Sequence, residues 1–150
     1  MSFAEFVPTA QDGDMRRAGR DTLTLALMSA RNRTLSWINA YASLLPSGRL
    51  EVPLTGELNP PLWELGHVGW FQEAWIARNV QRQRGSAADP TRTRLASVEP
   101  HADQWFDSTQ VPHDSRWALA LPDLDTIRQY LAAVSYTHLR AHEIKANLVC

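Results

Sequence analysis

Apolar residues recur at intervals of three and four positions between residues 14 and 45, which is the spacing of one helical face. The positions that carry this pattern are Leu23, Leu27, Ala30, Trp37, Ile38, Tyr41 and Leu45. Arginines lie largely at other positions, and Pro46, Ser47 and Gly48 provide a stop signal. The pattern predicts a long amphipathic helix over residues 14–45, preceded by a mobile lead-in at residues 1–13.

A second helix is predicted over residues 60–82, and it is apolar on most of its sides. Asn59 suits the N-cap position, and Pro60 suits the first helical position, where a missing N–H costs nothing. A helix of this composition should pack inside its domain. His67 stands in its middle and shares one helical face with several neighbours. These neighbours are Trp63, Trp70, Phe71 and Ala74.

Two glycines, Gly66 and Gly69, lie beside His67 within the predicted helix. Each costs roughly 1 kcal/mol relative to alanine in a helix interior, so we expect another backbone or a bound group to approach closely there. Burial of the aromatic rings on the same face should decide how the helix faces its domain. We therefore predict that His67 points inward rather than to solvent.

Two long connections separate the predicted helices. Residues 46–59 carry the punctuation of an ordered crossover loop, and residues 83–121 form a connection far longer than usual between helices. Asp123 and Asp125 then suit the positive end of the dipole of a third helix. The apolar stripe of this helix comprises Leu124, Ile127, Tyr130 and Leu131. No strand pattern or repeat occurs in the sequence, so the predicted fold class is all-α.

The charge and composition exclude several classes of partner. Net charge is −1, with 15 basic and 16 acidic side chains, which predicts no nucleic-acid partner and no anionic membrane partner. The apolar stretches are too short to span a membrane, and the first residues lack the architecture of a signal peptide. The single cysteine, Cys150, excludes an intramolecular disulfide and a cysteine-rich zinc site. These features predict a cytoplasmic protein.

The stretch 59–73, which reads NPPLWELGHVGWFQE, resembles the first metal-ligand helix of a known enzyme family. That family comprises the non-haem iron sulfoxide synthases of ergothioneine biosynthesis, and the likeness is strongest to their selenoneine-synthase relatives. The resemblance is to the DinB-like N-terminal domain, and it extends more loosely over residues 14–133, including the loop at 107–117. It implies an up-and-down four-helix bundle with long crossover loops, and His67 as one of three histidines that hold Fe(II).

The resemblance also implies that part of the enzyme is missing here. The family continues into a fourth helix and a C-terminal sulfatase-modifying-factor-like domain, whereas residues 135–150 resemble translated adapter read-through. We therefore expect an incomplete DinB-like domain over residues 1–134, truncated after its third helix, and a non-native tail over residues 135–150. Such a fragment would be inactive alone, although the intact parent would be an oxidoreductase.

His138 and His142 stand four positions apart, a spacing by which a helix can present two ligands to one metal. In the resembled family such a pair lies on the fourth helix, whereas here it continues the third helix without a turn signal. A metal triad of these two residues with His67 stays open. Coincidence within a non-native tail is the favoured interpretation.

His113 and Arg116 lie in the long loop before the third helix. In the ergothioneine-type enzymes, the corresponding loop carries two arginines that grip the carboxylates of a thiol substrate. Arg116 keeps the second place and His113 occupies the first, so the resemblance implies substrate binding by both and favours a less charged donor, such as a selenosugar. The alternative is a loop pair that is solvated or caps a helix. Glu64 and Glu73 are interpreted as surface carboxylates or as groups that orient His67.

The resemblance thus implies the N-terminal part of an Fe(II)- and O2-dependent synthase that forms a C–S or C–Se bond on trimethylhistidine. Its substrates would be trimethylhistidine and a thiol or selenosugar donor. Two alternatives remain open: a stand-alone DinB-like metal-dependent thiol transferase or hydrolase, and a metal-free structural helical fragment. The sequence assigns no catalytic residue.

Overall fold

The computed structural model describes residues 15–45, 50–89 and 91–146, with side chains as far as Thr137 apart from Arg16 and Arg82. The predicted lead-in at residues 1–13 and the stop signal at residues 46–48 lie outside the described residues. The chain divides into two compact units, Met1–Ala40 and Tyr41–Cys150, which are described separately.

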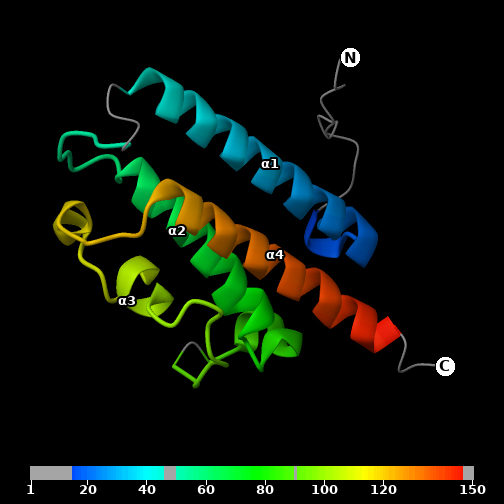
Figure 1. Ribbon diagram of the computed structural model, residues 1–150. Helices are drawn as coiled ribbons and strands as arrows, with labels where there is room; N and C mark the ends of the chain where they lie inside the picture. The colour runs from blue at the N-terminus through cyan, green and yellow to red at the C-terminus, as the bar shows by residue number, and fades with distance from the viewer. Residues whose placement is uncertain (1–14, 46–49, 90, 147–150) are drawn as a thin grey trace, which may run out of the picture. The chain divides into compact units, whose positions relative to one another are not determined.

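The described part of the chain contains helices and no strand, which confirms the all-α prediction (Figure 1). Its α-helices are α1 (Arg20–Leu44), α2 (Pro61–Gln72), α3 (Ala102–Phe106) and α4 (Leu124–Ala146). A π-helix, η2 (Glu73–Ala77), continues α2. Short 3-10 helices occur at η1 (Met15–Arg17), η3 (Arg82–Ala87) and η4 (His113–Trp117). No described helix is both long enough and apolar enough to cross a membrane.

The first unit consists largely of α1, whose 25 residues begin later than the predicted start at residue 14. A 3-10 turn, η1, occupies residues 15–17, and Gly19 separates it from α1. Of the predicted apolar stripe, Ile38 is buried. Leu23, Leu27, Trp37 and Tyr41 are exposed. The helix prediction is therefore right in type, within one residue at its end, and six residues too long at its start.

In the second unit, α2 begins one residue later than predicted. Pro60 is the N-cap residue and Pro61 the first helical residue, where the missing N–H again costs nothing. The Asn59 side chain makes no cap hydrogen bond, because it is engaged elsewhere: it donates to Glu64 and accepts from Arg116. The N-cap prediction is wrong for this reason.

The helical segment that contains His67 ends earlier than the predicted residue 82. The α-helical pattern stops at Gln72, and the π-helix η2 is closed by a hydrogen bond from Arg78 N to Glu73 O at 2.9 Å. That bond spans five residues instead of four. As a consequence, the side chains after Ala77 point in directions around the helix axis that differ from those of an uninterrupted α-helix.

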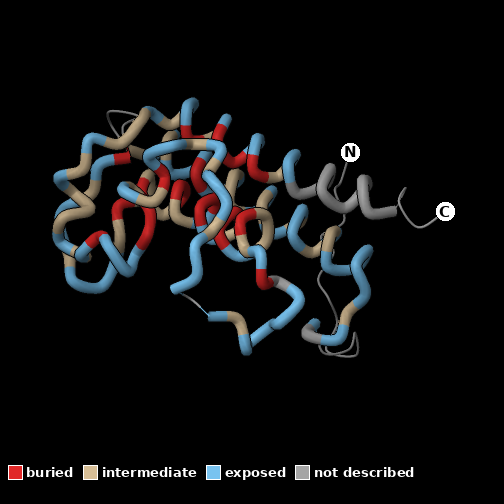
Figure 2. Tube along the Cα trace, turned by 90° about the horizontal axis from the view of Figure 1, so that it is seen from below, coloured by how far each residue is buried: buried red, intermediate tan, exposed pale blue. Residues whose placement is uncertain are grey.

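α2 and α4 run side by side in the same direction, and α3 lies against α2 (Figure 1). Figure 2 shows the buried stretches gathered in the middle of the chain trace, with exposed residues around them. The largest fully buried side chains are Trp63, Phe106, Leu50, Leu65, Ile127, Glu73 and Val134. The core of the second unit is therefore built where α2, α3 and α4 meet.

Both glycines beside His67 are needed for close packing, as the sequence predicts, but the close neighbours are side chains. A Cβ at Gly66 would lie 2.2 Å from the Phe106 ring, and one at Gly69 would lie 2.9 Å from Leu131 Cδ1. The expectation of a second backbone or a bound group beside His67 is corrected accordingly. An aromatic ring from α3 and an aliphatic side chain from α4 occupy that space.

α4 starts at Leu124, close to the predicted start, and Asp123 Oδ1 accepts from the backbone N of Thr126 at 2.8 Å. This bond satisfies one of the free amides of the first turn. The helix continues without a break past residue 134 to Ala146. The domain boundary at residue 134 and the non-native nature of residues 135–150 stay predictions.

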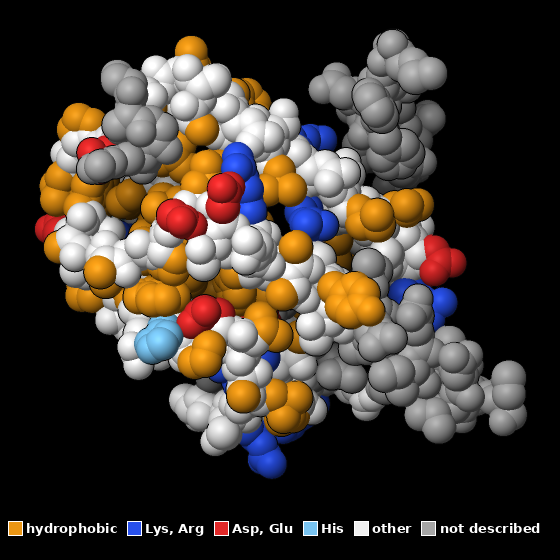
Figure 3. All heavy atoms as spheres, in the orientation of Figure 1, with side chains coloured by type: hydrophobic (Ala, Val, Ile, Leu, Met, Phe, Trp, Pro, Cys, Tyr) orange, Lys and Arg blue, Asp and Glu red, His pale blue; other side chains and the backbone are white. Residues whose placement is uncertain are grey.

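Acidic and basic side chains are interspersed on the face shown in Figure 3. On this face, hydrophobic side chains lie between the charged ones. The drawn surface thus offers mixed charge rather than a field of one sign.

Candidate metal-ligand site around His67

His67 lies between two tryptophans on one face of α2. Its ring centroid is 4.7 Å from that of Trp63 with planes 11° apart, and 5.7 Å from that of Trp70 with planes 20° apart. The spacings of four and three residues stack these rings along the helix. Trp63 and Trp70 are 1% and 3% exposed, and His67 is half-buried. Of the aromatics predicted to share this face, Phe71 is exposed.

Each of the two tryptophans also carries an arginine over its ring. The guanidinium carbon of Arg116 lies 4.0 Å from the Trp63 centroid, and that of Arg94 lies 5.6 Å from the Trp70 centroid. The ring faces attract these cations, and the attraction is stronger where water is excluded. The imidazole therefore sits among indoles whose own positions are fixed by stacking and by charge.

Three ring nitrogens on this face of α2 form hydrogen bonds with α3. The bonds are Trp63 Nε1 to Trp105 O at 2.7 Å, His67 Nδ1 to Phe106 O at 2.8 Å, and Trp70 Nε1 to Asp103 Oδ1 at 2.6 Å. The last carbonyls of a helix have no partner within the helix, so those of α3 are free to accept. α3 thus fixes all three rings at once.

The bond to Phe106 determines which nitrogen of His67 carries the proton. A carbonyl oxygen only accepts, so Nδ1 donates, and Nε2 of the neutral ring then holds the lone pair. Nε2 has no hydrogen-bond partner among the described residues. Histidines that bind metals characteristically donate their other ring N–H in this way. His67 is therefore in the tautomer that can coordinate a metal through Nε2.

α3 is anchored by an ion pair between Asp103 and Arg78. Arg78 Nη1 donates to Asp103 Oδ1, and Nη2 donates to Oδ2, both at 2.7 Å, which is the two-pronged geometry that guanidinium and carboxylate favour. Arg78 Nε also donates to Leu95 O at 2.6 Å. The bonds from Arg78 lower the pKa of Asp103 to about 2, and Asp103 raises the pKa of Arg78. Both groups are charged at neutral pH.

Asp107 ends α3 and is itself almost fully buried. Its carboxylate accepts from Thr109 N at 3.0 Å, from Thr109 Oγ1 at 2.7 Å and from Gln110 Nε2 at 2.9 Å. Burial alone would raise the pKa of Asp107, but these hydrogen bonds and the nearby Arg94 outweigh it, so the pKa is lower than usual. The Asp107 carboxylate thus holds the turn after α3 together through its bonds to Thr109 and Gln110.

A second buried carboxylate, Glu73, lies where α2 passes into η2. It accepts from Ser97 Oγ at 2.7 Å, from Val98 N at 2.7 Å and from Tyr130 OH at 2.8 Å. Burial and the neighbouring Glu73 carboxylate raise the pKa of Tyr130 far above its usual value. The interpretation of Glu73 as a surface group is wrong, since it is 2% exposed. It joins α2 to α4 and to the long loop.

His113 and Arg116, the predicted substrate-binding residues, lie at the N-terminal end of α2. His113 contacts Asp114 Oδ1 at 3.0 Å through Nδ1 and Leu58 O at 2.9 Å through Nε2. Asp114 and then the Leu58 carbonyl raise the pKa of His113, since both accept from the protonated ring. Arg116 donates to Asn59 Oδ1 at 2.5 Å and stacks on Trp63. One ring, that of Trp63, thus separates Arg116 from His67. Substrate binding by His113 or Arg116 stays a prediction.

The direction of α4 bears on the open triad of His67 with His138 and His142. Tyr130 and Leu131 lie beside Gly69, and α4 runs in the same direction as α2 (Figure 1). From residue 130 to residue 138 the helix advances about 12 Å at 1.5 Å per residue, away from the level of His67. The side chains of His138 and His142 lie outside the described residues, so only the course of the α4 backbone bears on the triad. This register disfavours the triad.

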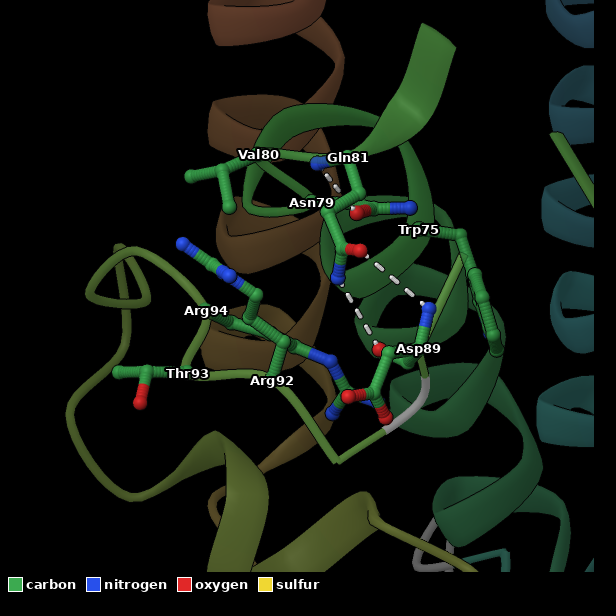
Figure 4. A pocket seen from close by; sticks show the side chains of 8 residues that line it. All are labelled: Trp75, Asn79, Val80, Gln81, Asp89, Arg92, Thr93 and Arg94. Atoms are coloured by element: carbon green, nitrogen blue, oxygen red, sulfur yellow. Dashed lines mark hydrogen bonds between the residues drawn. The ribbon is translucent and has the colours of Figure 1, made fainter. Parts of the chain in front are cut away.

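A small hollow beyond η2 is lined mainly by polar side chains (Figure 4). Gln81 organises it: its backbone N donates to Asn79 Oδ1 at 2.9 Å, and its Nε2 donates to Asp89 O at 3.2 Å. The hollow measures about 10 Å³, which is room for about one water molecule. It is too small for a substrate.

Comparison with known proteins gives one informative likeness. No family model matches this chain. The chain is similar to hercynine oxygenase from Mycolicibacterium thermoresistibile, with 32% identity over 115 residues. The aligned region covers 77% of this chain and 22% of that protein, so the chain spans a minor part of the length of the relative that it matches.

Proposed function

We propose that this chain is the N-terminal part of an iron-dependent oxygenase that acts on hercynine, the trimethylated form of histidine. Its likeness to hercynine oxygenase over 77% of the chain supports the reaction class. The observation that carries the proposal is the 2.8 Å bond from His67 Nδ1 to Phe106 O, because it leaves Nε2 available to a metal. His67 is accordingly the proposed Fe(II) ligand.

Among the described residues, one side chain, that of His67, is suited to bind Fe(II). A non-haem Fe(II) site needs several nitrogen or oxygen ligands with positions left open for oxygen and substrate. The described residues offer His67 and no complete ligand group, so the other ligands would come from a further helix of the intact protein. When bound, Fe(II) would supply the oxygen chemistry.

The contribution of this chain is to hold His67 in one orientation and one protonation state. Trp63 and Trp70 fix the plane of the imidazole and keep water from its faces, and the Phe106 carbonyl keeps the proton on Nδ1. A C-terminal sulfatase-modifying-factor-like domain would complete the hercynine-binding wall in the intact parent.

The sulfur or selenium donor is a finer part of the proposal. We propose that the product carries a new C–S or C–Se bond, and that the donor approaches the end of α2 where His113 and Arg116 lie. One arginine and one histidine stand where two arginines would grip two carboxylates. This difference favours a donor with less negative charge, such as a selenosugar.

The test requires the intact parent, recovered by sequencing the source DNA beyond codon 134. Hercynine-dependent oxygen uptake would be measured with a thiol donor and, separately, with a selenosugar donor. His67→Ala should lose both bound iron and activity, whereas His101→Ala should keep both, because His101 is exposed and pairs with Glu99. Full iron content in the His67→Ala enzyme would rule out the ligand assignment.

Of the alternatives, the metal-free helical fragment needs no group of metal ligands. A stand-alone metal-dependent transferase or hydrolase would need such a group. Elemental analysis of the intact parent separates them, since a structural protein would purify without stoichiometric iron or zinc.

A further inference from the structure

We propose that Asp103 is a positioning residue for His67, which acts by holding α3 so that the Phe106 carbonyl stays against His67 Nδ1. The proposal rests on the proposed role of His67 as a metal ligand and deepens it. Asp103 contacts neither the imidazole nor any group that would react. Its effect passes through α3, which it joins to Trp70 and Arg78.

α3 cannot hold its own position, because it has only five residues. Helices much shorter than about 12 residues are not stable in isolation, so tertiary contacts must define where α3 lies. The Phe106 ring packs against Gly66, an apolar contact without directional preference. A directional contact is therefore needed to fix the carbonyls of α3.

Asp103 supplies that contact with three hydrogen bonds. It accepts from Trp70 Nε1 at 2.6 Å and from the two terminal nitrogens of Arg78 at 2.7 Å each. Arg78 is in turn fixed by its bond to Leu95 O and is 6% exposed. The contact between Arg94 and Asp107, at the C-terminal end of α3, is longer at 4.0 Å. Trp105 O accepts one further bond, from Trp63 Nε1 at 2.7 Å, so Asp103, with three bonds, is the main directional tie of α3.

The geometry leaves little tolerance at the imidazole. Asp103 and Phe106 are three residues apart in α3, so a displacement of one is transmitted to the other. A shift of about 1 Å would lengthen the 2.8 Å bond beyond hydrogen-bonding range. His67 could then carry its proton on Nε2, where it blocks metal coordination. Losing such a supporting partner typically lowers metal affinity by about 10- to 100-fold.

The test reads the tautomer of His67 directly, in the 150-residue chain. Long-range ¹H–¹⁵N correlation spectra at about pH 8, where imidazole is neutral, should show the wild-type proton on Nδ1. Asp103→Asn should shift the population toward the Nε2–H tautomer. Asp125→Asn, which removes an exposed partner of Arg128 at the start of α4, should leave it unchanged.

A folded Asp103→Asn variant with the wild-type His67 tautomer would overturn the proposal. Should Asp103→Asn fail to fold by circular dichroism, Arg78→Lys replaces it, because lysine keeps the charge but loses the two-pronged bond. Arg78→Lys should move the tautomer in the same direction, and an unchanged tautomer there would equally overturn the proposal. The readout involves no metal, so a failure of the iron proposal in the intact parent remains a separate result.

Discussion

The two sides of α2 that face its neighbours are built from different interactions. Toward α4 the contact is mainly apolar and close, with Gly69 against Leu131. Toward α3 it is polar, with three ring nitrogens bonded to acceptors on that short helix. Apolar packing determines how near two helices lie, but it has no direction. The orientation of the His67 ring, and thus the position of its Nε2, therefore depends on the polar contacts with α3.

The largest effect is expected at Gly66. Alanine there would place Cβ 2.2 Å from the Phe106 ring, so α3 would have to move. Overpacking typically costs about 1–3 kcal/mol and occasionally more, which should outweigh the gain of about 1 kcal/mol from helix propensity. We expect a lower free energy of unfolding in urea and loss of the Nδ1–H tautomer of His67.

Gly69→Ala is the matched variant on the other side of α2. Its Cβ would meet Leu131 Cδ1, the end of a flexible side chain, at 2.9 Å, so the net change should stay within about 1 kcal/mol. Gly56→Ala meets nothing within 4 Å and controls for the substitution itself. Equal stability of Gly66→Ala and Gly69→Ala would remove the distinction between the two contacts.

The next largest effect on stability is expected at Glu73, the buried carboxylate that accepts from Tyr130 of α4. Glu73→Gln replaces one acceptor oxygen by a donor amide facing Ser97, Val98 and Tyr130. An unsatisfied buried polar group costs about 1–3 kcal/mol, so the urea midpoint should fall while the His67 tautomer stays as in wild type. The exposed Glu57→Gln serves as control. A tautomer change in Glu73→Gln would show that the α4 side also orients the imidazole.

A smaller effect should appear with pH. The pKa of Asp103 is lowered by Arg78 from 3.8 to about 2. Its contribution to stability is therefore present above about pH 4 and is lost as pH falls toward 2. The difference in unfolding free energy between wild type and Asp103→Asn should shrink over this range. Asp103 is partly exposed, so we expect a change on the order of 1 kcal/mol, and a pH-independent difference would contradict the assignment.

The smallest effect is expected from metal. With His67 as the one assigned ligand, Fe(II) or Zn(II) should hardly raise the melting temperature of the 150-residue chain. A complete site would be stabilised by roughly 2.7 kcal/mol at a metal concentration ~100 times the dissociation constant. A rise of several degrees that His138→Ala abolishes would show that residues 135–150 contain a true ligand helix.

The long helices can be predicted from the sequence, whereas the hydrogen bonds from α3 that orient His67 cannot. The hydrophobic period suffices to predict α1, α2 and α4, because each is long enough to show a repeat. α3 has five residues, too few to show one, and so the acceptors for His67 and Trp70 are invisible. The signal that could have revealed them is chemical: buried indoles need a partner for their N–H.

The burial of Glu73 was missed for a related reason. Carboxylates on a helix are usually solvated, and only the fold brings Ser97, Val98 and Tyr130, which are 24 to 57 residues away, to its oxygens. Arg78 and Asp103 are likewise 25 residues apart. Contacts between such distant residues follow from loop geometry, which a helical period does not encode.

The π-helix η2 changes the direction in which the side chains after it point around the helix axis. Its wider turn, closed by Arg78 N and Glu73 O at 2.9 Å, accommodates about one residue more than an α-helical turn. Each residue turns a helix by about 100°, so the inserted residue rotates Arg78 relative to the face that holds His67. Deleting a single residue from η2 would restore an uninterrupted α-helix and swing the guanidinium away from Asp103. The extra residue in the π-helical turn η2 therefore determines that the Arg78 side chain points toward Asp103 on α3.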